Sequence, residues 1–113
     1  MNIELLREYC LNLPHTTEDM KWGENLCFLI GKKLFCLVSL DEEFSVSLKV
    51  SEEDFHELVN RSGIDQAPYF ARNQWLNVKD PAALSEDEWN RLLKDAYSLI
   101  KSKLPRKLLE KFK

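Results

Sequence analysis

Basic side chains are the residues of this chain whose type and spacing most clearly suggest a chemistry. Lys and Arg bind phosphate through electrostatic contacts that do not depend on nucleotide sequence. They gather at a predicted hairpin turn, before the last predicted strand and in the C-terminal stretch. The candidate phosphate-binding residues are Lys32, Lys33, Lys49, Arg72, Lys101, Lys103, Arg106 and Lys107. The alternative is that these charges complement a helix C-terminus and keep an ordinary surface solvated.

The distribution of charge decides whether a basic surface is possible. The 113 residues carry 16 basic and 19 acidic side chains, a net charge of −3, which disfavours a protein coated in positive charge. Residues 1–60 hold 5 basic and 12 acidic side chains, whereas residues 61–113 hold 11 and 7. Residues 101–113 alone hold six basic side chains and one acidic side chain. The sequence therefore predicts that a phosphate-binding surface is local and includes the C-terminal end.

Aromatic residues beside the basic ones suggest a second hypothesis. Trp75 and Tyr69 flank Arg72 in the sequence, where their rings can stack on a base or another planar ligand. In this hypothesis Arg72 and Lys49 attract an anionic group and Trp75 supplies an apolar wall. The chain would then bind a protein or a small anionic ligand. The alternative is that these rings anchor a loop to the core.

Acidic residues near the N-terminus suggest a third hypothesis, frataxin-like metal handling. Glu4 and Glu8 lie one helical turn apart, and Glu18 and Asp19 follow in the next segment. Carboxylate oxygens hold hard cations. A solvated acidic face has the same pattern, however, and no histidine or cysteine stands at ligand spacing with these acids. We therefore predict no metal site and keep this acidic face as an alternative.

Enzymatic function has little support in the residue types. The chain holds two histidines, His15 and His56, which are both expected at the surface, and no recognisable pair of a nucleophile and its base. Its 3 glycines leave no room for a glycine-rich phosphate loop. We therefore predict a non-enzymatic protein that needs no cofactor.

Hydrophobic periodicity predicts the elements that position these residues. Apolar residues at helical spacing and candidate N-caps at Asn2, Ser51 and Ser85 predict three helices. The second helix is expected to end at Gly63, and a basic tail after Pro105 is expected to dock back through apolar side chains. Strands are predicted over 16–22, 26–30, 34–38, 44–50 and 75–78, a hairpin turn at 31–33, a further turn at 41–43 and an irregular segment over 64–74.

These elements define an α+β fold. We predict a single domain over residues 1–113, a two-layer sandwich in which helices pack on one face of an antiparallel sheet. Val46, Leu48 and Val50 alternate with polar residues, which is typical of a strand with one buried face. The side chains of Ser45, Ser47 and Lys49 are therefore predicted to lie on the open side of the sheet.

Cysteine usage and the N-terminal residues bear on the compartment. Cys10, Cys27 and Cys36 are an odd number with apolar neighbours, which favours reduced thiols packed in a core. Residues 1–8 alternate charged and apolar side chains and lack the apolar stretch of a signal peptide. We therefore expect a cytoplasmic location and no membrane partner.

Several short motifs in order along the chain resemble the MmcQ/YjbR family of small bacterial proteins, whose fold is described as CyaY-like, that is, similar to bacterial frataxins. The resemblance covers nearly the whole chain. It depends on residues 13–18, 31–35, 46–49, 72–78 and 96–107. The sequence departs from the family at His15, where members usually carry glycine, and at Ala96, where serine is common.

The resemblance implies a compact domain with an antiparallel sheet and a proposed DNA-binding role through hairpin-like elements. Carried onto this chain, that role falls on Lys32, Lys33, Lys49, Arg72 and the basic residues of 101–107. Our leading hypothesis is therefore weak, phosphate-directed DNA binding through the basic hairpin and the C-terminal half.

Overall fold

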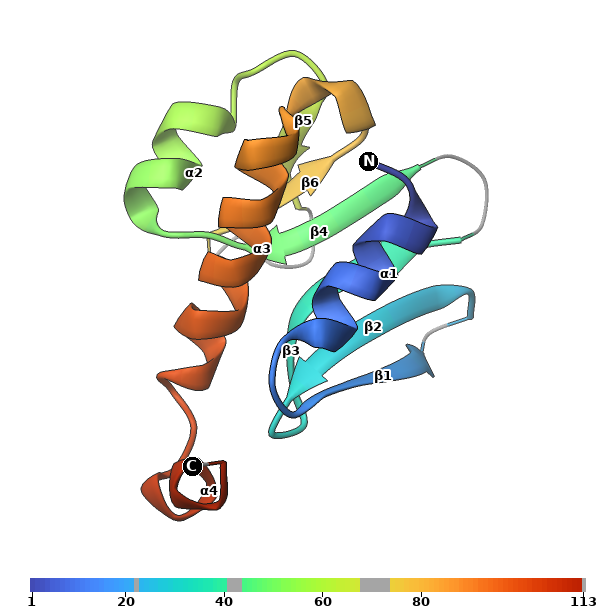
Figure 1. The fold of residues 1–113 in the computed structure, drawn as a ribbon. Coiled ribbons are helices and arrows are strands. Elements are labelled where there is room, and N and C mark those ends of the chain that lie inside the picture. The colour runs from blue at the N-terminus through green and yellow to red at the C-terminus, as the bar shows by residue number, and fades with distance from the viewer. Residues whose placement is uncertain (22, 41–43, 68–73, 113) are drawn as a thin grey trace.

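The computed structural model describes residues 1–21, 23–40, 44–67 and 74–112. The chain forms an α+β fold in which helices pack on a six-stranded antiparallel sheet (Figure 1). The helical elements are α1 (Ile3–Asn12), α2 (Glu52–Leu58), the 3₁₀ turn η2 (Pro81–Ala83), α3 (Glu86–Lys101) and α4 (Arg106–Lys111). The strands are β1 (Thr16–Lys21), β2 (Asn25–Ile30), β3 (Lys33–Ser39), β4 (Ser45–Lys49), β5 (Ile64–Gln66) and β6 (Trp75–Val78).

The sheet has the strand order β1-β2-β3-β4-β6-β5, and every neighbouring pair is antiparallel. The first four strands form the predicted meander, and β6 pairs with β4 after α2. The prediction of an irregular segment over 64–74 was wrong at its start, because Ile64–Gln66 forms the edge strand β5. Three residues with a single buried side chain are too short to show the period-two alternation that reveals a strand.

The helices begin at the N-cap residues that the sequence predicted. The amide of Leu5 donates to Asn2 Oδ1 at 2.9 Å, which satisfies one of the free N–H groups at the start of α1. Ser85 and Glu88 form a capping box at α3, with reciprocal bonds of 3.1 and 2.9 Å. The second helix ends before its predicted limit: α2 stops at Leu58, and Gly63 instead leads into β5 with a φ of +86°.

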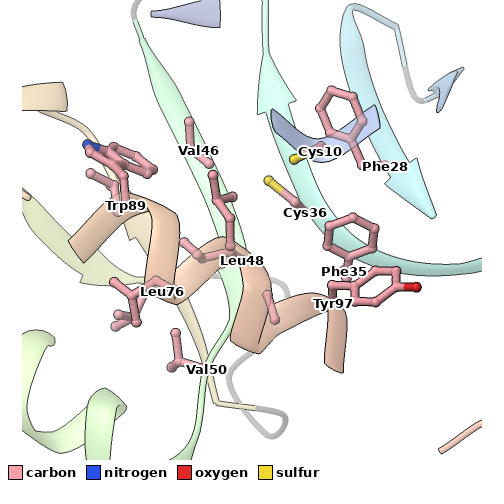
Figure 2. Close-up of a cluster of buried hydrophobic side chains, with 14 of the residues drawn as sticks. Cys10, Phe28, Phe35, Cys36, Val46, Leu48, Val50, Leu76, Trp89 and Tyr97 are labelled. Atoms are coloured by element: carbon pink, nitrogen blue, oxygen red, sulfur yellow. The ribbon is translucent and has the colours of Figure 1, made fainter. Parts of the chain in front are cut away.

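The core lies between the sheet and the helices (Figure 2). Val46 and Leu48 on β4 are fully buried against the face that α3 covers, where Leu92, Leu93 and Ala96 are also fully buried. Tyr97 of α3 packs edge-on against Phe35, with ring centroids 5.6 Å apart. The apolar side chains of the sheet and of α3 hold this helix across the middle of the sheet. The last turn of α3 therefore reaches the end of the sheet where β2 turns into β3 (Figure 1).

The prediction of an open polar face on β4 was wrong. Ser47 and Lys49 are each only 6% exposed. In register, Lys49 lies opposite Trp75 and Ser47 lies opposite Asn77, and Trp75 and Asn77 are themselves buried, so this face is covered across both strands. The Asn77 side-chain amide donates to Ser45 Oγ at 2.7 Å and to Ser47 Oγ at 2.9 Å, which satisfies polar groups that lose contact with water. Alternation located the strand correctly but did not reveal what covers its second face.

Candidate nucleic-acid interface

The basic residues of the hairpin and of the C-terminal stretch meet at one end of the molecule. Gly31, in the turn between β2 and β3, lies against the α3–α4 junction: a Cβ added to it would approach Leu108 Cδ2 to 2.7 Å and Leu104 Cδ1 to 2.8 Å. This contact joins segments that are about 75 residues apart in the sequence. We call this surface the basic pole. It comprises Lys32, Lys33, Lys101, Lys103, Arg106 and Lys107.

The turn that carries the first two of these lysines is a tight two-residue turn. Gly31 and Lys32 both have positive φ angles, +57° and +67°, as in the type I′ turns that suit the twist of a hairpin. Glycine adopts this conformation freely, whereas a lysine does so at a cost. The Lys32 side chain is exposed at the tip, and Lys33 follows it as the first, exposed residue of β3.

Most of the pole's charge is available to solvent. Lys32, Lys33, Lys103, Arg106 and Lys107 are exposed, and within the described residues only Arg106 has an ion-pair partner. That partner is Glu110, one helical turn away, at 3.5 Å; an exposed pair of this kind contributes little and leaves the arginine accessible. Lys101 is half-buried, with its Nζ 5.6 Å from the centre of the Tyr97 ring.

Lys49 lies below this surface rather than on it. Its side chain is buried, and its pKa is lowered by that burial and by the positive charge of Lys103. The prediction that Lys49 lies on the open side of the sheet is therefore wrong, and its buried side chain is not part of the pole.

The residues just before β1 lie beside the pole. The Tyr97 hydroxyl donates to the Pro14 carbonyl at 2.7 Å and so fixes the loop between α1 and β1 to α3. Thr16 lies opposite Ile30 in the sheet, which places His15 beside the β2–β3 turn. The His15 ring stacks on Phe112, just after α4, with centroids 4.6 Å apart and planes 21° from parallel. The sequence indicated that the apolar residues after Pro105 dock back, but it gave no signal for this pair.

The aromatic site of the second hypothesis is only partly described. Trp75 is 4% exposed and lies opposite Lys49 in the sheet, so its indole is part of the packed second face. Arg72 and Tyr69 lie outside the described residues, as does the predicted turn at 41–43.

The acidic residues of the third hypothesis do not gather. Glu18 accepts two hydrogen bonds from Arg7 on α1, at 2.6 and 2.7 Å, and these lower the pKa of its carboxyl group. Asp19, the next residue on β1, alternates to the other face, opposite Cys27. Glu4 and Glu8 are exposed on α1. In the part of the chain that the structure describes, no three His, Cys, Asp or Glu side chains are grouped to hold a metal ion.

The three cysteines are free and buried. The Cys36 thiol lies against Cys10, and both the hydrogen bond that its S–H donates to Cys10 and burial hold its pKa well above the ordinary value (Figure 2). Burial also raises the pKa of Cys27. Raised pKa values disfavour the thiolate, which makes Cys27 and Cys36 core residues rather than nucleophiles.

Comparison with known proteins identifies the class of this fold. The YjbR family profile, described simply as YjbR, matches residues 11–99. The chain therefore belongs to the YjbR family. A search of curated proteins gave no significant match.

Two solved structures share the fold. One is the crystal structure of Deinococcus radiodurans protein DR2400, described with a DUF419 domain, with a TM-score of 0.87 and 22% identity over 98% of this chain and 87% of that one. The other is a protein from Pseudomonas syringae, with a TM-score of 0.70 and 21% identity over 88% of this chain and 98% of that one. Neither name assigns an activity. Among the described helices of our chain, none is long and apolar enough to span a bilayer.

Proposed function

We propose that this YjbR-family chain is a non-enzymatic DNA-binding protein that contacts backbone phosphates through the basic pole. One observation carries the proposal: the contact of Gly31 with Leu104 and Leu108 places the lysines of the hairpin next to the basic residues of the α3–α4 junction. Together the two segments expose five basic side chains at one end. Clustered Lys and Arg of this kind bind phosphates irrespective of base sequence.

The remaining surface supports binding by this end alone. The first turn of α2 contains Glu52, Glu53 and Asp54, and the first turn of α3 contains three further acidic residues. These carboxylates repel a phosphate backbone and so orient the protein with its basic pole toward the nucleic acid. The proposal includes a cytoplasmic location, which buried free cysteines support.

The dependence of affinity on salt tests the proposal. If all five exposed basic residues contact phosphates of duplex DNA, log Kd changes with log salt with a slope of at most about 4.5. Fluorescence anisotropy with labelled single-stranded and duplex oligonucleotides, measured from ~50 to ~200 mM salt, gives this slope. If neither the single-stranded nor the duplex oligonucleotide binds at ~50 mM salt, the proposal is ruled out.

Two double variants make the test specific. Lys32→Gln with Lys107→Gln removes one charge from each side of the pole and is expected to lower the slope by up to about 1.8. Lys79→Gln with Lys94→Gln removes the same charge elsewhere: Lys79 follows β6 at the opposite end of the sheet, and Lys94 is exposed in the middle of α3. This control is expected to bind as the wild type does. Equal losses in both variants would mean that net charge, not the pole, determines binding.

One observation favours a second candidate function, binding of a small anionic ligand. Burial lowers the pKa of Lys49, and the positive charge of its neighbour Lys103 lowers it further. An anion between them would relieve this repulsion. Inorganic phosphate is then expected to raise the melting temperature of the wild type but not of Lys49→Met, whereas equal stabilisation of both proteins would rule this candidate out.

A further inference from the structure

Two strained residues lie side by side at the basic pole. Within the described chain, three residues other than glycine have positive φ angles: His15 at +62°, Lys32 at +67° and Gln74 at +55°. Because Thr16 pairs with Ile30, the first two flank the same end of the β1–β2 ladder. Side chains in the left-handed region cost free energy relative to glycine, and such residues concentrate at functional sites. The pole therefore holds a lysine and a histidine where glycine would fit the backbone better.

The histidine presents an aromatic surface. The His15 residue is exposed, and one face of its ring is supported by Phe112 at a centroid distance of 4.6 Å. The hydrogen bond from Tyr97 to the Pro14 carbonyl, at 2.7 Å, fixes the backbone immediately before the ring. His15 is therefore held in place before any ligand binds, which reduces the entropy that binding costs.

Basic side chains beside an exposed aromatic ring distinguish single-stranded from duplex nucleic acid. In a duplex the faces of the bases are stacked on each other, so a side chain reaches only phosphates and groove edges. In a single strand the bases are free to stack on aromatic rings while basic residues follow the backbone. His15 beside Lys32 and Lys33 offers both contacts within the reach of a few nucleotides.

We propose that the basic pole binds single-stranded nucleic acid in preference to duplex, with one base stacked on His15 and the adjacent phosphates on Lys32 and Lys33. This inference rests on the proposed function and specifies its ligand class. Glycine at position 15 would suit the left-handed backbone but would supply no ring.

The test compares a labelled oligothymidylate of about 12 nucleotides, within the site size of small single-strand binders, with a duplex of equal length. The expected result is tighter binding of the single strand at equal salt. His15→Gly relaxes the backbone and removes the ring, so it is expected to weaken single-strand binding about 5-fold or more, the loss of one stacked base. Its affinity for the duplex is expected to stay unchanged.

Two further variants separate stacking from other effects. His15→Asn keeps a side chain that tolerates the left-handed region but has no ring, and it is expected to lose as much single-strand affinity as His15→Gly. His56→Ala removes the other histidine, which is exposed on α2, and is expected to change nothing.

Each outcome of these measurements has a distinct meaning. Equal or tighter binding of the duplex, or unchanged single-strand binding by both His15 variants, overturns this inference while the proposed phosphate-binding function survives. Absence of binding to both probes overturns the two together.

Discussion

Replacing Lys32 by glycine is expected to stabilise the protein and to weaken DNA binding at the same time. Lys32 has a φ of +67° as the second residue of the β2–β3 turn. The left-handed conformation costs a non-glycine residue about 1–2 kcal/mol. Glycine avoids that cost but loses about 0.5–1 kcal/mol through the greater freedom of the unfolded chain. The net gain in the free energy of unfolding is about 0.5–1 kcal/mol.

Thermal unfolding followed by circular dichroism measures this gain. An entropy of unfolding of about 2.1 cal/mol/K per residue gives about 240 cal/mol/K for the 113 residues, so the melting temperature should rise by about 2–4 °C. If Lys32 contacts a phosphate as proposed, the same variant should lower the slope of log Kd against log salt by about 0.9 for duplex DNA.

Lys33→Gly is the matched control. Lys33 is the neighbouring exposed lysine, but it begins β3 and is not among the residues with positive φ. Glycine at such a strand position is expected to lower stability by about 0.5–1 kcal/mol while removing the same charge. A melting temperature that falls in both variants would refute the argument from backbone strain. Unchanged DNA binding in both would refute the role of the hairpin tip.

Further predictions concern the elements that support the pole and the core. Gly31→Ala puts a methyl group 2.7 Å from a side chain at a φ of +57°, so a loss of about 2–4 kcal/mol is expected in urea unfolding; wild-type stability would contradict the close packing of α4 on the turn. Asn77→Ala leaves Ser47 Oγ without its amide donor and is expected to cost about 1–3 kcal/mol by the same measurement, whereas a neutral effect would mean that water replaces the amide. The side-chain hydrogen bond from Arg61, and then the Ser85 backbone amide, lower the pKa of Glu88, so its stabilisation is present above its ordinary pKa of 4.5 and is lost as pH falls through the lowered value. Arg61→Gln should reduce this loss of stability at acid pH. If the free energy of unfolding depends on pH as in the wild type, the role of Arg61 is contradicted.

Local patterns predicted most of the fold. Helical spacing and caps placed α1 and α3, and alternation placed β4, because these signals depend on residues close in sequence. The edge strand β5 and the burial of Ser47 escaped prediction because both depend on neighbouring strands. The YjbR family is confirmed, while the CyaY-like description stays a prediction.

The candidate site could be predicted only in part. Charge counting located the hairpin tip and the C-terminal stretch, but their meeting depends on the contact of Leu104 and Leu108 with Gly31, which no local pattern contains. The left-handed conformation of His15 and its stack on Phe112 depend on α4 returning to β1. Tertiary packing, rather than composition, therefore determines which of the charged and aromatic residues share a surface.

The most direct test of the central claim is to map the amide signals of the protein by nuclear magnetic resonance during titration with a short oligonucleotide. We expect the largest shifts on His15, on residues 31–33 and on residues 103–107, which lie in the basic pole or beside it. Shifts confined to other surfaces, such as the acidic first turns of α2 and α3, or none at ~50 mM salt, would contradict it.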